Sequence, residues 1–452
     1  MSALDASRSQ ALDRTLALMR DHIGDVASDG ELLAELWRCG VVLVADRANA
    51  SSRQGQVALI TAALLCARTG ADVCIVADDV PLVGLHPPLR GPRLLEGLVE
   101  VGGDLIPGST IKIGDQASRD RTGLCVLIGN TPRPLGIGAE FTARICGDTW
   151  SGSLLPANEA GESWVRVHGP FGAMTSAALV AAEAYKLVMR RLRNASKAKS
   201  DVFDLMFGPS PRATVRLAAL GTPCPSELGE VDFISGGAVT HAALYALSRI
   251  EGVTASGRVI EPQTYDLSNL NRYTLMRRSD VMLGKARHLA DLDLGGIRLE
   301  PIPERYGETL QRTLGELADS VLVGVDHIPS RWTAQAHARG WLGVAGTEHY
   351  DTMVSFHDEG TPCAACLHYS DGGIDPRAPT VAFVSFWAGL WLAALYVRHR
   401  AGQRPPLAEQ VVRTTMLRPD LGYAIEALPV PQRSDCRLSC GGTSASKVGH
   451  RN

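Results

Sequence analysis

The stretch that decides the fold is residues 229–263, GEVDFISGGAVTHAALYALSRIEGVTASGRVIEPQ. An apolar run, residues 229–234, ends in a turn that contains Gly236 and Gly237, and a helical pattern of apolar residues follows. A second apolar run then ends at Glu261. Strand, turn, helix and strand in this order predict a βαβ unit, which opens a doubly wound parallel sheet.

The first half of the chain carries the same order of elements. After a helical pattern that runs to about Arg38, GVVLVAD predicts a strand, a polar loop and an apolar helix follow, and DVCIVADD predicts a second strand. Each half closes with a long apolar helix, residues 171–192 and 383–402. The sequence therefore predicts an α/β protein with two tandem doubly wound, Rossmann-like domains. Their expected ranges are 1–200 and 210–440, followed by a disordered tail, 441–452.

The composition is that of a globular protein without a nucleic-acid partner. Among 452 residues 21% are charged and the net charge is -3, so no basic surplus marks a nucleic-acid surface. The N-terminus lacks a secretory signal, and the ten scattered cysteines are typical of buried thiols in a reducing cytoplasm. Residues 380–397 have nearly the length of a membrane span. Their isolation favours a buried helix instead, so we expect a cytoplasmic protein without membrane contact.

The turn at residues 235–240 is expected to hold phosphate. A glycine-rich turn before a helix lets backbone N–H groups approach a phosphate group. Against the pattern G-x-G-x-x-G only Gly237 matches, while Ser235 and Thr240 occupy the outer glycine positions, where side chains would crowd the phosphates. Glu261 lies 24 residues after Gly237 and is placed to accept hydrogen bonds from ribose hydroxyls. A solvated carboxylate at the strand end is the alternative.

The segment after Glu261 carries the most specific motif. It contains Glu-Pro at residues 261–262, S-N-L-N-R at residues 268–272 and G-K-A at residues 284–286. Together these motifs resemble the signature of ThiF-like adenylating enzymes, the group that includes ubiquitin-activating enzymes. The resemblance covers about residues 215–440 and implies a ThiF-like adenylation domain in the second half.

The resemblance implies ATP-dependent adenylation of a carboxylate, a reaction whose site must neutralise phosphate charge. It implies that Glu261 holds the ribose and that Asn271 and Arg272 hold the phosphates. Lys285 would also contact phosphate, and Asp326, which follows an apolar strand, would bind a magnesium ion. A helix N-cap is the alternative role for Asp326. The implied nucleotide-binding residues are Gly236, Gly237, Glu261, Asn269, Asn271, Arg272 and Lys285, and the implied catalytic set is Arg272, Lys285 and Asp326.

Four cysteines near the C-terminus have metal-ligand spacing. Cys363 and Cys366 form C-x-x-C, and Cys436 and Cys440 form C-x-x-x-C. Four thiolates satisfy tetrahedral zinc, and paired spacing lets each short turn supply two ligands. ThiF-like proteins often carry such a split site, so the resemblance implies a structural zinc ion. Free loop thiols are the alternative, and His368 is an alternative ligand.

The first half has no counterpart of the S-N-L-N-R motif, so it is predicted to be an inactive partner domain. Ubiquitin-activating enzymes are similar, because they pair an inactive and an active half in a pseudo-dimer. In that family the inactive half donates an arginine to the active site, and the resemblance implies the same here. The candidate residues are Arg8, Arg14, Arg20, Arg47 and Arg53.

The resemblance implies a bacterial enzyme that activates the C-terminal carboxylate of a ubiquitin-like carrier protein, with a ubiquitin-conjugating-like enzyme as a further partner. Relatives that form a thioester use a cysteine in the loop after C-x-x-C, but residues 367–400 contain none. Cys224 is a loop cysteine near the start of the second half. Adenylation alone, for a sulfur carrier or for peptide modification, is therefore an alternative. A non-catalytic nucleotide-binding scaffold and an NAD-dependent oxidoreductase are further alternatives.

Overall fold

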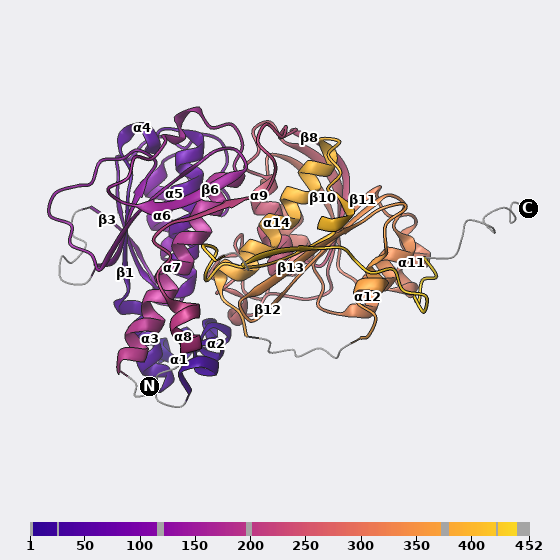
Figure 1. Cartoon of the computed structure of the whole chain (residues 1–452), viewed down its shortest axis with the longest axis horizontal. Helices are drawn as coiled ribbons and strands as arrows, with labels where there is room; N and C mark the ends of the chain where they lie inside the picture. Colours follow the sequence, from indigo (N-terminus) through magenta and orange to yellow (C-terminus); the bar gives the residue numbers. More distant parts are fainter. Residues whose placement is uncertain are drawn as a thin grey trace, which may run out of the picture.

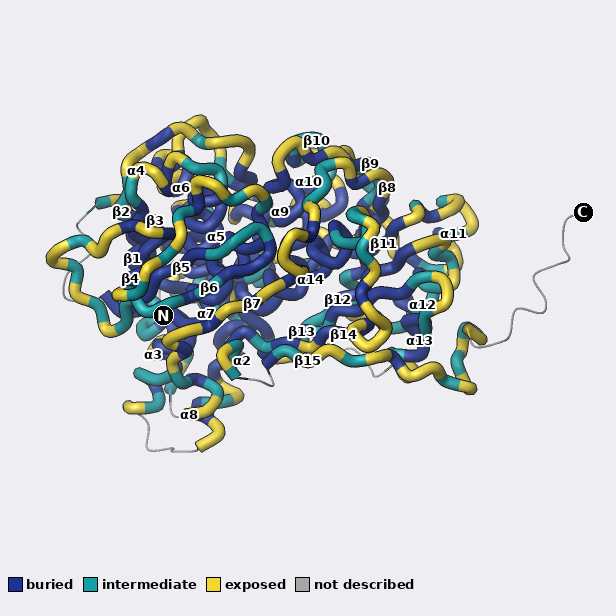
Figure 2. Tube along the Cα trace, turned by 45° about the horizontal axis from the view of Figure 1, so that its top comes forward, coloured by how far each residue is buried: buried dark blue, intermediate teal, exposed yellow. Residues whose placement is uncertain are grey.

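The computed structural model describes residues 3–24, 27–114, 122–195, 201–371, 379–421 and 424–440. The predicted disordered tail, 441–452, lies outside these ranges. The chain forms two α/β halves that lie side by side, each built around its own sheet (Figure 1). Buried segments run through the centre of both halves, and exposed segments lie on α8, α11 and the outer loops (Figure 2).

In the part of the first half that the structure describes, the strand order of the sheet is β3-β2-β1-β4-β5-β6-β7. Neighbouring strands from β3 to β5 are parallel, and β6 and β7 join antiparallel at one edge. The strands are β1 (Gly40–Val44), β2 (Asp72–Val76), β3 (Ile111–Ile113), β4 (Thr122–Ile128), β5 (Phe141–Gly147), β6 (Ser151–Pro156) and β7 (Ala213–Arg216). The helices are α1 (Ala3–Ala11), α2 (Asp13–Ile23), α3 (Asp29–Arg38), α4 (Arg47–Ala50), α5 (Arg53–Thr69), α6 (Leu94–Gly102), α7 (Phe171–Ala195) and α8 (Asp201–Phe207).

The sheet of the second half has the order β10-β9-β8-β11-β12-β13-β14-β15 over the same described ranges. Neighbouring strands from β10 to β12 are parallel, and the pairs β12–β13, β13–β14 and β14–β15 are antiparallel. The strands are β8 (Glu227–Ile234), β9 (Thr254–Ile260), β10 (Gly296–Ile302), β11 (Ser320–Val323), β12 (Trp341–Glu348), β13 (Asp351–His357), β14 (Val411–Thr415) and β15 (Ile425–Leu428). The helices are α9 (Ala238–Leu247), α10 (Lys285–Asp291), α11 (Glu308–Leu314), α12 (Ile328–His337), α13 (Ala364–Leu367) and α14 (Ala382–Arg400).

The two sheets confirm the predicted tandem, doubly wound α/β fold. Strands β8 to β14 repeat the order of β1 to β7, and β15 is added at the edge. The predicted polar loop after β1 contains a helix, α4, because the Asp46 carboxylate accepts a 2.8 Å hydrogen bond from the Asn49 N–H and so caps it. Strand β7 falls inside the range predicted for the second domain but pairs with β6 of the first sheet.

The halves pack through four helices, α5 and α7 from the first and α9 and α14 from the second. The hydroxyls of Thr61 and Tyr245 form a buried 2.8 Å hydrogen bond between the halves, and Tyr185 and Tyr350 form another. The predicted buried helix is confirmed, because every residue of α14 from 382 to 397 is buried. No helix in the described ranges has the length and apolar character needed to cross a membrane. The halves therefore form a pseudo-dimer around shared apolar helices.

Candidate nucleotide site and cysteine cluster

A cavity of about 1570 Å³ opens where β8, β9 and β11 end, and residues of α2 and α8 from the first half also line it. This is the carboxyl edge of the parallel strands, where doubly wound sheets bind their ligands. Of the predicted site residues, those that line the cavity are Gly237, Glu261, Asn269, Arg272, Lys285 and Asp326. Gly236 and Asn271 are buried and do not line the cavity.

The turn before α9 is held by side chains as well as by glycine. One carboxylate oxygen of Glu261 accepts the Gly236 N–H at 2.9 Å, and the other accepts the Gln263 N–H at 2.9 Å. A Cβ atom at Gly236 would lie 2.9 Å from Cγ of Glu261, which explains the glycine. Gly237 is the N-cap of α9 without a side-chain cap, so the first-turn N–H groups border the cavity. Such a helix start favours an anion.

Thr240 differs from the expectation, and its neighbour His241 packs away from the cavity. Thr240 was expected to crowd the phosphates, but its side chain is buried and its hydroxyl oxygen lies 3.3 Å from where a Cβ atom of Gly324 would stand. Gly324, directly after β11, has no side chain, and this leaves space for the Thr240 hydroxyl away from the phosphate-binding turn. His241 is fully buried, and its Nε2 lies 2.9 Å from Oη of Tyr265, so it neither caps α9 nor reaches the cavity.

Asn271 supports Arg272 from behind. The Asn271 side chain is fully buried and donates to Thr15 Oγ1 at 3.1 Å and to the Thr380 carbonyl at 3.3 Å. Its oxygen accepts a 2.8 Å hydrogen bond from the Arg272 guanidinium. Burial lowers the pKa of Arg272, and the nearby Arg14 lowers it further. Asn269 acts locally, because its side chain accepts the N–H of residue 266 at 3.0 Å.

Tyr273 is a cavity residue that the sequence analysis missed. Lys285 Nζ donates to Gln263 Oε1 at 2.8 Å and lies 3.3 Å from Tyr273 Oη. The centre of the Tyr273 ring lies 5.2 Å from Lys285 Nζ and 5.4 Å from the guanidinium carbon of Arg272. An aromatic face stabilises such cations. The signal was present, because this tyrosine directly follows the S-N-L-N-R motif.

Asp326 is exposed at the cavity, three residues after β11 ends. The helix that follows, α12, has His327 as its N-cap, so the capping role considered for Asp326 belongs to its neighbour. Arg331 on that helix donates to the Val325 carbonyl at 2.8 Å. Burial lowers the pKa of Arg331 to about 10 against the opposing effect of Asp326, so it is charged at neutral pH. A carboxylate next to cationic side chains suits a nucleotide with bound magnesium, because the carboxylate can bind the metal ion and the cations can bind the phosphates.

Of the five candidate arginines of the first half, one lines the cavity and four do not. Arg14, on α2, lines the cavity. The other four side chains bind elsewhere: Arg8 to the Pro107 carbonyl, Arg20 to Asp29, Arg47 to Asp78 and Arg53 to the Arg249 carbonyl. Arg14 is therefore the arginine that the first half brings to this site.

The corresponding place in the first half is filled by its own side chains. Asn49 donates to Asp46 and Asn130 at 2.9 Å each and accepts the Trp164 N–H at 3.0 Å. Arg144 donates to backbone carbonyls that include Gly129 (2.6 Å). These polar groups are thus hydrogen-bonded within the first half.

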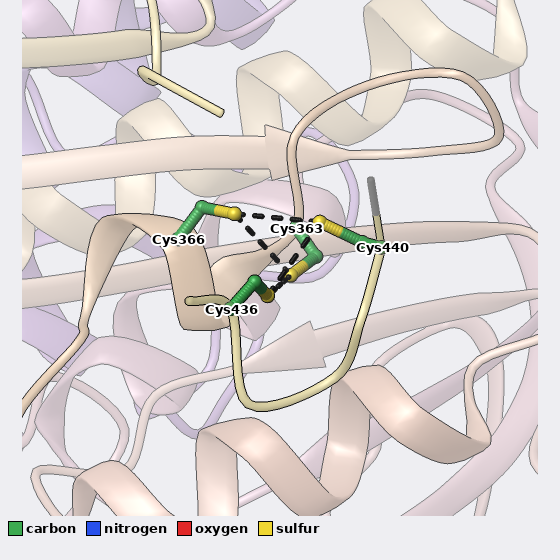
Figure 3. Close-up of side chains that lie close together, drawn as sticks. All are labelled: Cys363, Cys366, Cys436 and Cys440. Carbon is green, nitrogen blue, oxygen red and sulfur yellow. Dashed lines mark hydrogen bonds between the residues drawn. The ribbon is translucent and has the colours of Figure 1, made fainter. Parts of the chain in front are cut away.

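The four cysteines come together, as Figure 3 shows. Cys363 is the N-cap of α13, and Cys366 lies within that helix. Their sulfur atoms all lie within 4.8 Å of one another, so the group could hold a metal ion. The Cys363–Cys436 and Cys366–Cys440 pairs are 3.3 Å apart, too long for a disulfide bond. Tetrahedral zinc with sulfur ligands at about 2.3 Å places the sulfurs about 3.8 Å apart, which this cluster fits.

His368 is not part of the cluster. Its Nε2 lies 2.9 Å from the Arg331 guanidinium, and its carbonyl accepts a 2.7 Å hydrogen bond from Trp332 Nε1. The alternative ligand is thus used to hold α12, the helix that begins beside Asp326. The cluster and the cavity are linked through α13 and α12.

We expect the purified protein to carry about one zinc ion per chain, which elemental analysis measures. Cys436→Ser should remove the ion and lower the Tm by about 5 °C or more, because the metal ties the 363–366 turn to the C-terminal segment. Cys224→Ser, at a free cysteine outside the cluster, is the control. Equal zinc content in both variants would contradict the assignment.

Ser235 occupies a backbone conformation that favours glycine, with φ of 113°. Its hydroxyl also accepts the Gly237 N–H at 2.9 Å, a donor that a phosphate would need. Ser235→Gly should therefore raise the free energy of unfolding by about 1 kcal/mol and tighten MgATP binding. Ser235→Ala, which keeps the strain and removes the hydroxyl, should tighten binding without the gain in stability. Denaturant titration and calorimetry measure the two effects.

Comparison with known proteins gives two sequence likenesses. Residues 40–203 match the family model described as the BilD N-terminal domain, so this match lies within the first half. The chain is also 25% identical over 346 residues to y4jF of Sinorhizobium fredii (strain NBRC 101917 / NGR234), described as an uncharacterized protein. The aligned region covers 76% of this chain and 63% of the relative. The chain thus spans less than two thirds of that relative's length.

Solved structures with a similar fold have low sequence identity. The crystal structure of E. coli MccB with selenomethionine MccA has a TM-score of 0.39 and 15% identity, and covers 66% of this chain and 98% of that chain. Selenomethionine PaaA has a TM-score of 0.34 and 19% identity, and covers 44% of this chain and 64% of that chain. At these values neither structure carries a residue role over to this chain.

Proposed function

We propose that the second half binds MgATP in the cavity and adenylates the C-terminal carboxylate of a ubiquitin-like carrier protein. The observation that carries the proposal is the set of charged side chains that line one cavity together with the first residues of α9. Glu261, Arg272, Lys285 and Asp326 come from separate segments of the second half, and Arg14 joins them from the first. A ribose acceptor, phosphate-binding cations and a magnesium ligand are what a nucleoside triphosphate requires.

In the proposed reaction a carboxylate oxygen of the carrier attacks the α-phosphorus of ATP. The new bond joins this oxygen to phosphorus, and the bond to the leaving pyrophosphate breaks. Arg272 and Lys285 neutralise the charge that develops on the phosphate oxygens, and Glu261 holds the ribose hydroxyls. Asp326 would hold the magnesium ion, which screens the charge of the leaving group.

The first half is proposed to be an inactive partner that contributes Arg14. Two observations support this: its candidate site is filled by Asn49 and Arg144, and it lacks a glycine-rich turn after β1. The match to the BilD N-terminal domain lies in this half. The proposed domain ranges are those expected from the sequence, with β7 contributed to the first sheet.

We propose that the acyl group of the adenylate passes directly to a partner's thiol, such as that of a ubiquitin-conjugating-like enzyme. A thioester bond to the sulfur forms, the bond between the acyl carbon and the phosphate oxygen breaks, and AMP leaves. Burial raises the pKa of the Cys224 thiol to about 12, so it is not a thiolate at neutral pH. Residues 367–400 contain no cysteine. Adenylation without thioester formation, for a sulfur carrier or a peptide, is the second candidate for the same reason.

The test is ATP–pyrophosphate exchange with labelled pyrophosphate and each candidate carrier protein or peptide. Exchange that requires a carrier with a free C-terminus supports adenylation, and the carrier that is accepted separates the two candidates. MgATP binding without exchange for any carrier would leave only the non-catalytic scaffold. No MgATP binding would reject the nucleotide site altogether.

A further inference from the structure

A second arginine of the first half, Arg68, contacts the loop of the second half that contains the S-N-L-N-R motif at residues 268–272. Arg68 lies near the C-terminal end of α5, and its side chain is fully buried. Its guanidinium donates hydrogen bonds to the backbone carbonyls of Leu270 at 2.6 Å, Thr274 at 3.1 Å and Met276. One cation from the first half therefore holds the loop on both sides of Arg272.

The shape of this loop depends on that cation. Residues 270–276 form successive turns outside any helix or sheet strand, so their carbonyls need partners of another kind. A guanidinium has five N–H donors in a rigid fork, and it fixes several acceptors relative to one another. A buried cation without these acceptors would be costly, so the loop and Arg68 stabilise each other. Removing the fork leaves buried carbonyls without donors.

The second half holds the first in a similar way. Arg249 follows α9, the helix that corresponds to α5, and it is also fully buried. Its guanidinium donates to the Pro87 carbonyl, in the loop after β2, which corresponds to the loop after β9. That loop carries none of the candidate site residues. Arg68 thus binds carbonyls of residues 270–276 directly. Its counterpart Arg249 binds none of them, and the loop that it holds contacts the segment after them through the Pro88 carbonyl, which accepts a hydrogen bond from Arg277.

We propose that Arg68 is a positioning residue for the nucleotide site, holding residues 270–276 so that Arg272 and Tyr273 face the phosphates. It acts through the loop, because Arg272 and Tyr273 line the cavity whereas the Arg68 side chain is fully buried behind them. The inference rests on the function proposed above, since it requires that the cavity bind MgATP. It gives the inactive half a second role besides Arg14.

The test compares Arg68→Met with Arg249→Met in the full-length protein. Methionine keeps much of the apolar stem and removes the donors, and both variants are expected to lower the Tm to a similar extent. The dissociation constant of MgATP, measured by calorimetry, should rise roughly 10- to 100-fold in Arg68→Met, as for residues that hold metal ligands in place. It should stay within about twofold of the wild type in Arg249→Met. Arg68→Lys keeps the charge but not the fork of donors, so its dissociation constant for MgATP should lie between those of the wild type and Arg68→Met.

The outcomes separate this inference from the proposed function. Unchanged MgATP affinity in Arg68→Met, with a wild type that binds, overturns the inference alone. Equal losses of affinity in the two methionine variants also overturn it, because they indicate a general effect of the weakened interface. A wild-type protein that does not bind MgATP overturns both proposals. If Arg68→Met does not fold, the same criteria apply to Arg68→Lys and Arg249→Lys.

Discussion

Replacing Asp326 with asparagine is expected to lower the rate of ATP–pyrophosphate exchange about a thousandfold, because a magnesium ligand supplies several kcal/mol of charge stabilisation. Asp326 is exposed at the cavity after β11, and no capping role ties it to α12, whose N-cap is His327. Its loss should therefore leave the fold and the Tm nearly unchanged. The exchange rate at saturating ATP measures the effect, and a magnesium titration should show a weakened dependence.

Asp319→Asn is the matched control. This aspartate precedes β11 at the opposite edge of the same sheet and is also exposed. The same loss of one negative charge there should leave exchange within about twofold of the wild type, as expected for a surface substitution. If Asp326→Asn exchanges at the wild-type rate, the magnesium assignment is wrong even when the rest of the site is correct.

The sequence predicted the helices and strands whose apolar pattern is clear within a short segment of the chain. The apolar runs of β1 and β8 and the helices behind them have a clear period, and their order alone gives the doubly wound topology. Among the strands that were not predicted, β7 and β15 are only four residues long and partly exposed. What makes them strands is pairing with distant segments, which no local pattern records.

The candidate site was predictable as a set of residues but not as a geometry. Four segments between Glu261 and Asp326 do converge on one cavity, as the motif implies. The sequence could not show that Asn271 is buried behind Arg272, or that Ser235 occupies a positive φ and binds the Gly237 N–H. These features arise from packing and backbone geometry. The 70-residue gap between Cys366 and Cys436 likewise closes only in the folded chain.

The contribution of the first half was the least predictable part. Arg8, Arg14 and Arg20 are spaced along the same N-terminal region, and nothing in their sequence surroundings distinguishes them. The structure does, because α2 packs next to the S-N-L-N-R loop, where Thr15 accepts a hydrogen bond from Asn271. Arg14 is adjacent to that contact and lines the cavity.

We therefore expect Arg14→Ala to lower the exchange rate at least about a hundredfold, the usual cost of removing a group that stabilises developing charge. Burial raises the pKa of Asp13 although Arg14 opposes the shift, so the pair lies partly shielded from water beside Arg272. A cation in such a place acts strongly on phosphate. Should Arg14 act mainly in the transition state, kcat should fall while the dissociation constant of MgATP changes little.

Arg20→Ala is the control for this variant, because Arg20 lies on the same helix and its ion pair with Asp29, at 2.9 Å, is on the surface. An exposed pair contributes at most about 1 kcal/mol, so Arg20→Ala should have near wild-type exchange and Tm. Equal losses of exchange in the two variants would mean that α2 supports the site only by its packing. A loss confined to Arg14→Ala would mean that the site of the second half needs a residue from the first half to be complete.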